Sequence, residues 1–181
     1  MYNTRRFFTV SLSLTAGLML IVNPLSAQFD NNLDVPYVPT PPEVVEAMLK
    51  LAGVKKTDTV IDLGCGDGRI VVAAAQKFGA RAMGFDLDPQ RIREATENAR
   101  SAGLGERAKF FEKNLFEVDV SPANVVTLYL LQTVNEKLKP TLQKQLKPGS
   151  RIVSHTFTMG DWKPDKEIEI SGRRLYLWVI K

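Results

Sequence analysis

The stretch Asp62-Leu63-Gly64-Cys65-Gly66-Asp67-Gly68 lies between a short apolar run at 59–63 and an almost wholly apolar run at 69–78. The first run has the length of a buried strand, and the second has that of a buried helix, which Gly79 ends. Gly64 and Gly66 can adopt backbone angles closed to other residues, and they place no side chain between the main chain and a ligand. A glycine turn between a strand and a helix lies at the carboxyl edge of a parallel sheet, where such folds bind their ligands.

The spacing of this turn differs from that of the dinucleotide-binding fingerprint. Its glycines follow the pattern Gly-x-Gly-x-Gly, and Arg69 stands where the third glycine of the fingerprint would fall. Asp62 precedes the loop by two positions, and Asp86 closes the next expected strand, 20 positions past Gly66. A carboxylate at that strand end can accept hydrogen bonds from both hydroxyls of a ribose. The loop, the preceding acid and the strand-end acid together indicate a ligand that carries a ribose.

Further apolar runs along the chain alternate between strand length and helix length. Strands are expected at 82–86, 108–112, 125–130 and 151–155, and a hairpin is expected at 167–170 and 175–180 around Ser171–Gly172. Helices are expected before the first strand, at 69–78, after Asp88-Pro89, and at 133–146. This alternation predicts an α/β fold with helices on both faces of a parallel sheet, and the hairpin adds one antiparallel strand.

Two helix boundaries carry specific expectations. Thr40 is expected to be the N-cap of the helix before the first strand, with Pro41 at its first helical position and Glu43 completing a capping box. The pattern at 133–146 contains Pro140, which is expected to break or kink that helix because proline has no backbone N–H.

From about residue 37 to residue 181, the chain resembles the class I S-adenosylmethionine-dependent methyltransferases. Asp62, Gly64, Gly66 and Gly68 match the first motif of this family, and Asp86 matches its ribose-binding acid. The resemblance implies S-adenosyl-L-methionine as the cofactor, whose ammonium and sulfonium suit the acids around the loop. It also implies a doubly wound, Rossmann-like sheet of seven strands in the order 3-2-1-4-5-7-6, with strand 7 antiparallel.

The resemblance extends to the adenine end of the site and to a smaller group. Asn114 stands where the family often has an acid near the adenine, and its amide suits a contact to the adenine edge. Residues 36–40 and 62–71 are similar to the mitochondrial lysine N-methyltransferases that act on the ATP synthase c subunit and on the ADP/ATP carrier, and to their bacterial relatives. In such enzymes the segment before the first helix lies over the cofactor, so Tyr37 is expected to help close the pocket. The alternative is a tyrosine packed for area alone.

The resemblance places the methyl acceptor at the carboxyl ends of the fourth and fifth strands. Tyr129 and His155 are the candidate catalytic residues there, and a purely structural histidine is the alternative for His155. Trp162 could line the acceptor channel or anchor a loop in the core. The sequence 130–132, Leu-Leu-Gln, replaces the Asn/Asp-Pro-Pro-aromatic motif of nucleobase N-methyltransferases, so no nucleic acid is expected as partner.

The favoured function is therefore an S-adenosylmethionine-dependent methyltransferase with a protein lysine as acceptor. A small-molecule or lipid methyltransferase is the alternative within the same class. A third interpretation is an exported, non-catalytic module that retains the nucleoside-binding fold.

Composition restricts the kinds of site that the chain can form. The net charge is +4, and without Arg5 and Arg6 the chain has 22 basic and 20 acidic residues with no clustered basic patch. Cys65 is the only cysteine and His155 the only histidine, which excludes an internal disulfide, a Cys-rich zinc site and a His cluster. No metal site is expected. Cys65 could be a nucleophile, but a small residue that fits the tight turn is the better explanation.

Residues 1–27 have the order of a secretory signal. Arg5 and Arg6 precede an apolar run at 7–22, and the small pair Ser26–Ala27 follows. Cleavage after Ala27 would leave a methyltransferase domain at 28–181; an uncleaved membrane anchor or an organellar presequence are the alternatives. An exported or membrane-anchored domain would contact the membrane only through this segment. That location conflicts with the cytosolic supply of the cofactor.

Overall fold

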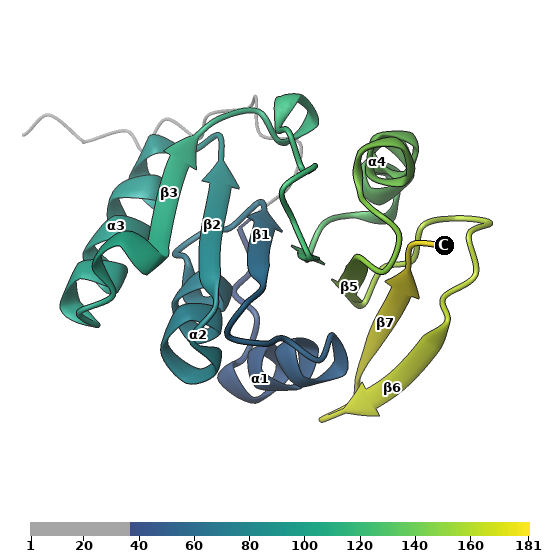
Figure 1. The fold of residues 1–181 in the computed structure, drawn as a ribbon, viewed down its shortest axis with the longest axis horizontal. Helices are drawn as coiled ribbons and strands as arrows, with labels where there is room; N and C mark the ends of the chain where they lie inside the picture. Colours follow the sequence, from purple (N-terminus) through teal and green to yellow (C-terminus); the bar gives the residue numbers. More distant parts are fainter. Residues whose placement is uncertain (1–36) are drawn as a thin grey trace, which may run out of the picture. The chain divides into compact units, whose positions relative to one another are not determined.

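The computed structural model describes residues 37–181, and the expected leader at 1–27 lies outside them. The described chain alternates helices and strands as Figure 1 shows, in the order α1 (Pro42–Leu51), β1 (Thr59–Leu63), α2 (Arg69–Phe78), β2 (Arg81–Asp86), α3 (Pro89–Ser101), β3 (Ala108–Glu112), β4 (Val125–Leu128), α4 (Gln132–Gln145), β5 (Arg151–His155), β6 (Lys166–Ile170) and β7 (Arg173–Val179). Two short 3-10 helices, η1 (Gly105–Arg107) and η2 (Leu115–Glu117), flank β3. None of the helices in this part of the chain is both long enough and apolar enough to cross a membrane.

The seven strands form one sheet in the order β3-β2-β1-β4-β5-β7-β6. Strands β1 to β5 are parallel, and β7 is antiparallel to both β5 and β6. This arrangement confirms the predicted doubly wound fold, including the antiparallel seventh strand. The carboxyl ends of β1, β2 and β4 therefore meet at one edge of the sheet, where the glycine turn lies.

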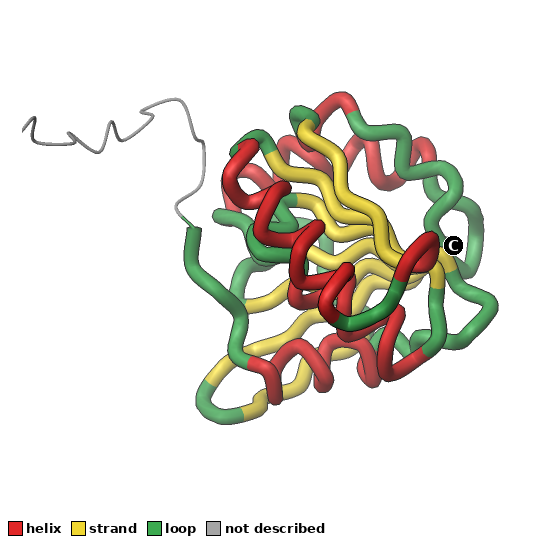
Figure 2. The backbone as a smooth tube through the Cα atoms, turned by 90° about the vertical axis from the view of Figure 1, so that its left-hand side faces the viewer, coloured by secondary structure: helices red, strands yellow, loops and turns green. Residues whose placement is uncertain are grey.

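Side-chain alternation along the strands separates two hydrophobic cores, one on each face of the sheet. On β1, for example, Val60 belongs to one core, whereas Ile61 and Leu63 belong to the other. Helices α1, α2 and α3 cover the first face, and α4 covers the second, so the sheet lies between two helical layers (Figure 2).

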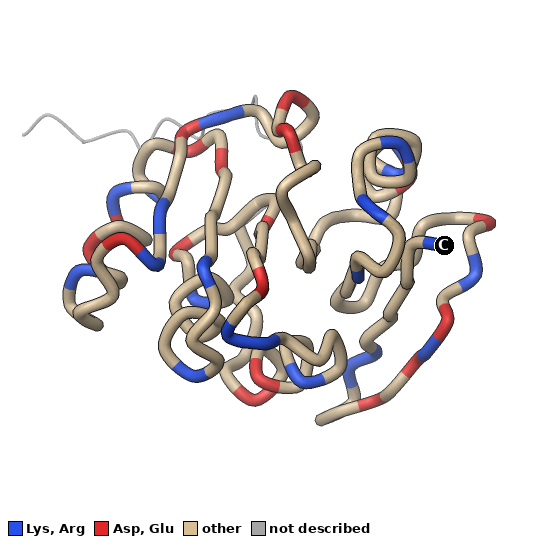
Figure 3. The backbone as a smooth tube through the Cα atoms, in the orientation of Figure 1, with Lys and Arg blue, Asp and Glu red and all other residues tan. Residues whose placement is uncertain are grey.

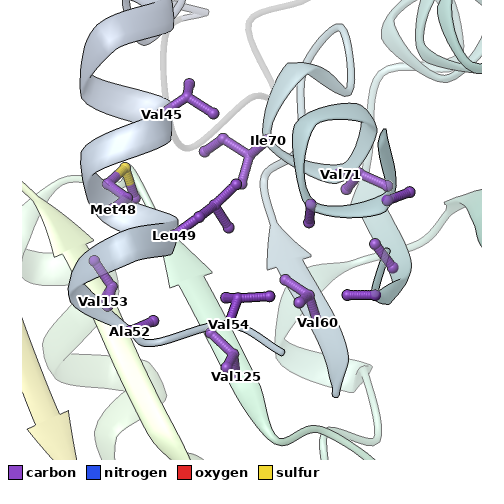
Figure 4. Close-up of a cluster of buried hydrophobic side chains, with 14 of the residues drawn as sticks. Val45, Met48, Leu49, Ala52, Val54, Val60, Ile70, Val71, Val125 and Val153 are labelled. Atoms are coloured by element: carbon purple, nitrogen blue, oxygen red, sulfur yellow. The ribbon is translucent and has the colours of Figure 1, made fainter. Parts of the chain in front are cut away.

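The first core joins α1 to α2 and to the central strands, as the side chains in Figure 4 show. Its largest members pack where two helices and three parallel strands meet, and they include Val45, Met48 and Leu49 of α1, Ile70 and Val71 of α2, and Val60, Val125 and Val153 of the sheet. Most of these side chains are completely buried. Burial of one such side chain contributes about 1.5–3 kcal/mol, so this core fixes the start of α2 and the turn before it.

The start of α1 differs from the predicted capping box. The helix begins at Pro42, its N-cap is Pro41, and no side chain caps it. The hydroxyl of Thr40 instead lies 3.2 Å from Nδ1 of His155, on the fifth strand. The prediction was wrong because a tertiary partner 115 residues away takes the hydroxyl that local sequence assigns to the helix.

Helix α4 is not broken at Pro140, because it runs from Gln132 to Gln145 with the proline inside it. Its buried stripe of Val134, Leu138 and Leu142 continues on both sides of the proline, which is itself exposed. Packing of this stripe against the second core compensates for the hydrogen bond that proline cannot donate.

Replacing Pro140 with alanine is therefore expected to raise the free energy of unfolding by about 1–2 kcal/mol. Alanine restores a backbone donor inside the helix and removes a steric conflict, while the greater freedom of the unfolded chain offsets part of the gain. Urea unfolding of the two proteins, followed by circular dichroism, measures the difference. A Pro140→Ala protein no more stable than the wild type would show that α4 already accommodates the ring without cost.

Candidate active site

A cavity of about 190 Å³ opens at the carboxyl edge of the sheet. Its walls come from the segment 37–40, the glycine turn after β1, the end of β2, residues 113–115 after β3, residues 129–131 after β4, and Phe157 after β5. Strand β4 ends at Leu128 rather than at the predicted residue 130, and this earlier end releases 129–131 to line the cavity.

The glycine turn is fixed to the end of β2 and is closed over by other parts of the chain. The amides of Gly64 and Cys65 both donate to the carbonyl of Phe85, at 2.8 and 3.0 Å. A Cβ added to Gly64 would lie 2.7 Å from Leu130, and one added to Gly66 would lie 2.5 Å from the ring of Tyr37. Both residues also have positive φ, so other residues are excluded by strain and by these contacts.

Gly68 also has a structural role. It is the N-cap of α2 with φ of 77°, and it does not line the cavity. A Cβ there would lie 2.6 Å from Phe110 and 2.8 Å from Ala95. The third glycine of the motif is therefore required for packing of α2 against α3 and β3, and its contact with the cofactor stays a prediction.

Asp86, at the end of β2, supports the glycine turn and lines the cavity. One carboxylate oxygen accepts from the amide of Gly66 at 2.8 Å, and the other accepts from the amide of Asp88 at 3.0 Å. Because each carboxylate oxygen can accept two hydrogen bonds, Asp86 can still accept two ribose hydroxyls without losing either backbone contact.

Asp62 is an almost fully buried carboxyl that also lines the cavity. It accepts a 2.7 Å hydrogen bond from the hydroxyl of Thr127, which faces it across the β1–β4 pair. Burial raises the pKa of Asp62 to about 7, with smaller contributions from the charges of Asp86 and Asp67, and the hydrogen bond from Thr127 opposes part of this rise. A cation placed beside Asp62 would favour its ionised form, so this position suits a positively charged ligand group.

Residues 37–40, which we call the strap, cross the glycine turn at the mouth of the cavity. The Arg91 guanidinium lies 4.5 Å from the centre of the Tyr37 ring. Arg69 donates to the carbonyl of Thr40 at 2.8 Å and makes two side-chain hydrogen bonds to Asp67. Tyr37 as a whole residue is 44% exposed, which does not support a residue packed for area alone. The strap instead closes one side of the cavity.

Replacing Tyr37 with alanine is expected to weaken binding of S-adenosylhomocysteine about 10-fold. The ring covers Gly66 and stacks on Arg91, so its loss opens the cavity and frees the strap. Isothermal titration calorimetry measures the affinity, and Tyr37→Phe, which retains the ring, is the matched control. Equal affinities for the alanine and phenylalanine variants would contradict a covering role for the ring.

Asn114 lies just after β3, at one end of the sheet. Strands β2 and β1 lie between β3 and β4, so Asn114 is on the opposite side of the cavity from residues 129–131. Its side-chain oxygen accepts from the amide of Phe116 at 3.1 Å and caps η2, and the residue lines the cavity. Nδ2 can donate to an adenine edge, and Oδ1 has a second lone pair with which it can accept from one.

The two candidate catalytic residues lie in different surroundings. Tyr129 lines the cavity and stacks on the ring of His155, with ring centres 3.9 Å apart. His155 is fully buried behind Tyr129 and does not line the cavity, and burial lowers its pKa to about 4. A direct catalytic contact by His155 therefore does not fit the geometry, and the structural alternative does. Trp162 likewise lies outside this cavity, where its ring packs on Trp178.

Phe157 and Arg91 line the cavity but were not predicted as site residues. Phe157 lies two positions past the end of β5, and no motif marks it. Arg91 lies in the first turn of α3, where its spacing from Asp88 suggests only a surface ion pair. The position of each depends on a turn or a partner that spacing alone does not reveal.

Comparison with known proteins agrees with this geometry. The ANTKMT methyltransferase domain family matches residues 62–166. A protein-lysine N-methyltransferase from Saccharolobus islandicus is 49% identical over 151 residues, which cover 81% of this chain and 94% of that protein. A lysine N-methyltransferase of the ATP synthase c subunit from Xenopus laevis is 31% identical over 149 residues, which cover 82% of this chain and 65% of that protein.

A solved structure is similarly close. The crystal structure of an RNA methyltransferase from Salinibacter ruber in complex with S-adenosyl-L-homocysteine is 50% identical, with a TM-score of 0.78, and the match covers 79% of this chain and 94% of that one. The family match, the sheet order and the cavity at the glycine turn agree. The chain belongs to the ANTKMT methyltransferase domain family and is an S-adenosylmethionine-dependent methyltransferase of the class I fold.

Proposed function

We propose that the protein transfers a methyl group from S-adenosylmethionine to the side-chain amine of a lysine in another protein. The observation that carries this proposal is the apolar acceptor end of the cavity. Tyr129, Leu130, Leu131 and Phe157 line that end, and none of their side chains has the amide or carboxylate that reads a nucleobase. The 49% identical lysine N-methyltransferase from Saccharolobus islandicus supports the same acceptor.

The residues of the cavity fit the cofactor group by group. Asp86 would accept the ribose hydroxyls, Asn114 would contact the adenine edge, and the buried carboxyl of Asp62 would face the ammonium of the methionine part. Gly64 and Gly66 bring the main chain to the ligand, and Tyr37 covers it from the strap. When bound, S-adenosylmethionine supplies a methyl group carried on a positively charged sulfur. An acceptor nitrogen in line with the carbon–sulfur bond would take the methyl group, and the sulfur would leave as a neutral thioether.

The protein's own contribution to the reaction is to position the acceptor and to exclude water. Correct alignment of two reactants can lower a barrier by about 7–11 kcal/mol. A lysine amine must be neutral to attack, and its pKa of about 10.4 falls when the group enters an apolar channel. The proton leaves the amine for solvent before attack, so the channel needs no dedicated base, and the buried, largely neutral His155 is not positioned to serve as one.

The competing acceptor is RNA, because the Salinibacter ruber protein is described as an RNA methyltransferase. Basic and acidic residues are interspersed along the backbone of the described chain, as Figure 3 shows. Nucleic-acid binding usually depends on a clustered basic surface, so the charge pattern favours a protein acceptor.

A labelled transfer experiment distinguishes the two acceptors. The protein is incubated with S-adenosylmethionine carrying a tritiated methyl group and a dialysed cell extract, which is then treated with RNase or with protease. We expect label in protein that resists RNase and that co-elutes with N-methyllysine after acid hydrolysis. Label that RNase releases would overturn the proposal, and the Asp86→Ala variant controls for methylation by other enzymes.

We also propose that residues 1–27 direct the chain to or across a membrane. The support is the order of Arg5-Arg6, the apolar run at 7–22 and the small pair Ser26–Ala27. Mass spectrometry of the mature protein tests the idea. A new N-terminus at Gln28 indicates a cleaved signal, whereas a soluble cytosolic chain that retains Met1 would contradict both a signal and an anchor.

A further inference from the structure

The chain makes an unusual turn directly after β5. Thr156 has φ of 67°, and the amide of Phe157 donates to the carbonyl of His155 at 2.8 Å, which closes a three-residue turn. A β-branched residue at positive φ is a true outlier, with a cost of about 1–3 kcal/mol. Such strain persists only where surrounding contacts enforce it, and it concentrates at functional sites.

Buried polar groups enforce this turn from three directions. The carbonyl of Phe157 accepts from the hydroxyl of Ser154 at 2.6 Å and from the side-chain amide of Asn135 at 3.3 Å. Ser154 and Asn135 are completely buried, on β5 and α4. The amide of Thr156 donates to the carbonyl of Arg174 on β7 at 2.8 Å. The backbone of Phe157 is therefore held by a network that links two strands and a helix.

The consequence of the turn is the position of the Phe157 ring. Phe157 lines the cavity, and its ring stacks with that of Tyr129, with centres 6.3 Å apart and planes 27° apart. Tyr129 in turn rests on the buried ring of His155. Two aromatic side chains, from the ends of β4 and β5, thus form one wall at the acceptor end, and a third ring supports them from behind.

The charged side chains that line the cavity lie on its cofactor side. They are four carboxylates, Asp62, Asp67, Asp86 and Asp88, and three cations, Arg69, Arg91 and Lys113, from the glycine turn, the end of β2, α3 and the segment after β3. Residues 129–131 and Phe157 carry no charge. Burial lowers the pKa of the imidazole behind Tyr129 to about 4, so it adds no positive charge at neutral pH. A cation at the acceptor end therefore meets aromatic faces, which attract cations within about 6 Å.

We propose that Phe157 and Tyr129 form an aromatic wall that binds the methylated ammonium group of the acceptor. This inference rests on the proposed lysine methyltransferase function and adds a preference for the number of methyl groups on the product. A monomethyl- or dimethyl-ammonium product held against the two rings stays in the channel while S-adenosylhomocysteine is exchanged for S-adenosylmethionine. It then loses a proton to solvent, and the neutral amine attacks the next methyl group. The wall thus favours multiply methylated lysine, and Phe157 is a specificity-determining residue that no sequence motif marks.

The first test measures the wall without an acceptor protein. Choline and 3,3-dimethylbutan-1-ol have nearly the same shape, but only choline carries a trimethylammonium charge. We expect the protein saturated with S-adenosylhomocysteine to bind choline at least fivefold more tightly than the neutral alcohol by NMR titration. Phe157→Leu, which keeps apolar volume without a ring, should abolish that preference. Phe111→Leu is the matched control, because Phe111 is an exposed ring outside the cavity.

The second test measures the products. Protein from the labelled extract is hydrolysed, and monomethyl-, dimethyl- and trimethyllysine are separated. We expect Phe157→Leu to shift the product toward monomethyllysine at least threefold, while its affinity for S-adenosylhomocysteine and its melting temperature match those of Phe111→Leu. Unchanged products, or a choline preference that survives Phe157→Leu, would overturn the wall. Choline binding that depends on Phe157 without any methyllysine would support the wall and refute the lysine acceptor.

Discussion

Asp86→Ala is expected to raise the dissociation constant for S-adenosylhomocysteine at least 100-fold. The carboxylate can accept two ribose hydroxyls, and each hydrogen bond to a charged group contributes about 1.5–3 kcal/mol. Loss of both corresponds to more than a factor of 100 in affinity. The same carboxylate holds the amides of Gly66 and Asp88, so its removal also frees the glycine turn.

Two further variants separate these contributions, with calorimetric titration as the measurement. Asp86→Asn keeps one acceptor oxygen and is expected to lose less affinity than the alanine variant. Glu97→Gln removes an exposed acid from the outer face of α3 and should bind like the wild type. Thermal unfolding establishes that each variant is folded. An Asp86→Ala protein whose affinity stays within threefold of the wild type would refute the ribose assignment.

The sequence predicts most of the fold because its periodicities are strong. The bounds of β1, α2, β3 and β5 agree with the predicted ranges. Each of the three strands has a pair of β-branched or aromatic residues at its centre, and α2 is a mostly apolar run that Gly79 ends. The sheet order followed from resemblance to a known family rather than from periodicity, and the strand pairing confirms it. Local pattern thus defines the elements, whereas their order in the sheet depends on long-range packing.

The site was less predictable, because several of its residues depend on tertiary contacts. Gly68 matches a motif, but its lack of a side chain makes room for Phe110 and Ala95. His155 ends a strand at the cavity edge of the sheet, yet the ring of Tyr129 lies between His155 and the cavity. Phe157 reaches the cavity through a positive-φ turn at threonine, a conformation that threonine itself does not suggest. Spacing identifies the edge of the sheet but does not indicate which side chains project from it.

The buried carboxyl of Asp62 makes stability and function oppose each other. Its pKa is about 7 in the folded protein, chiefly because burial disfavours the charged form, and it is near 3.9 in an unfolded chain. Between these values the folded state holds the proton that the unfolded state has released. Stability from this group is therefore complete below pH 4 and is lost as the pH rises through 7. The loss reaches about 4 kcal/mol at pH 8, since each pKa unit corresponds to about 1.4 kcal/mol.

Asp62→Asn is therefore expected to make the cofactor-free protein more stable than the wild type at pH 8, while weakening its affinity for S-adenosylhomocysteine at least 10-fold. Asparagine keeps an oxygen for the Thr127 hydroxyl and has no charge to bury, but it cannot pair with the ligand's ammonium. Denaturant unfolding from pH 5 to pH 8 measures the first effect, and calorimetry measures the second. Asp119→Asn removes an exposed carboxylate whose pKa is lowered by hydrogen bonds from Ser121, so it should not reproduce either change. Stability curves that stay parallel for Asp62→Asn and the wild type over this range would contradict the raised pKa, because they would show that the buried carboxyl is already ionised at pH 5 in the folded protein. With the raised pKa, the ligand's ammonium draws the proton from Asp62 when it binds below pH 7, and proton release in buffers of different ionisation enthalpy detects it.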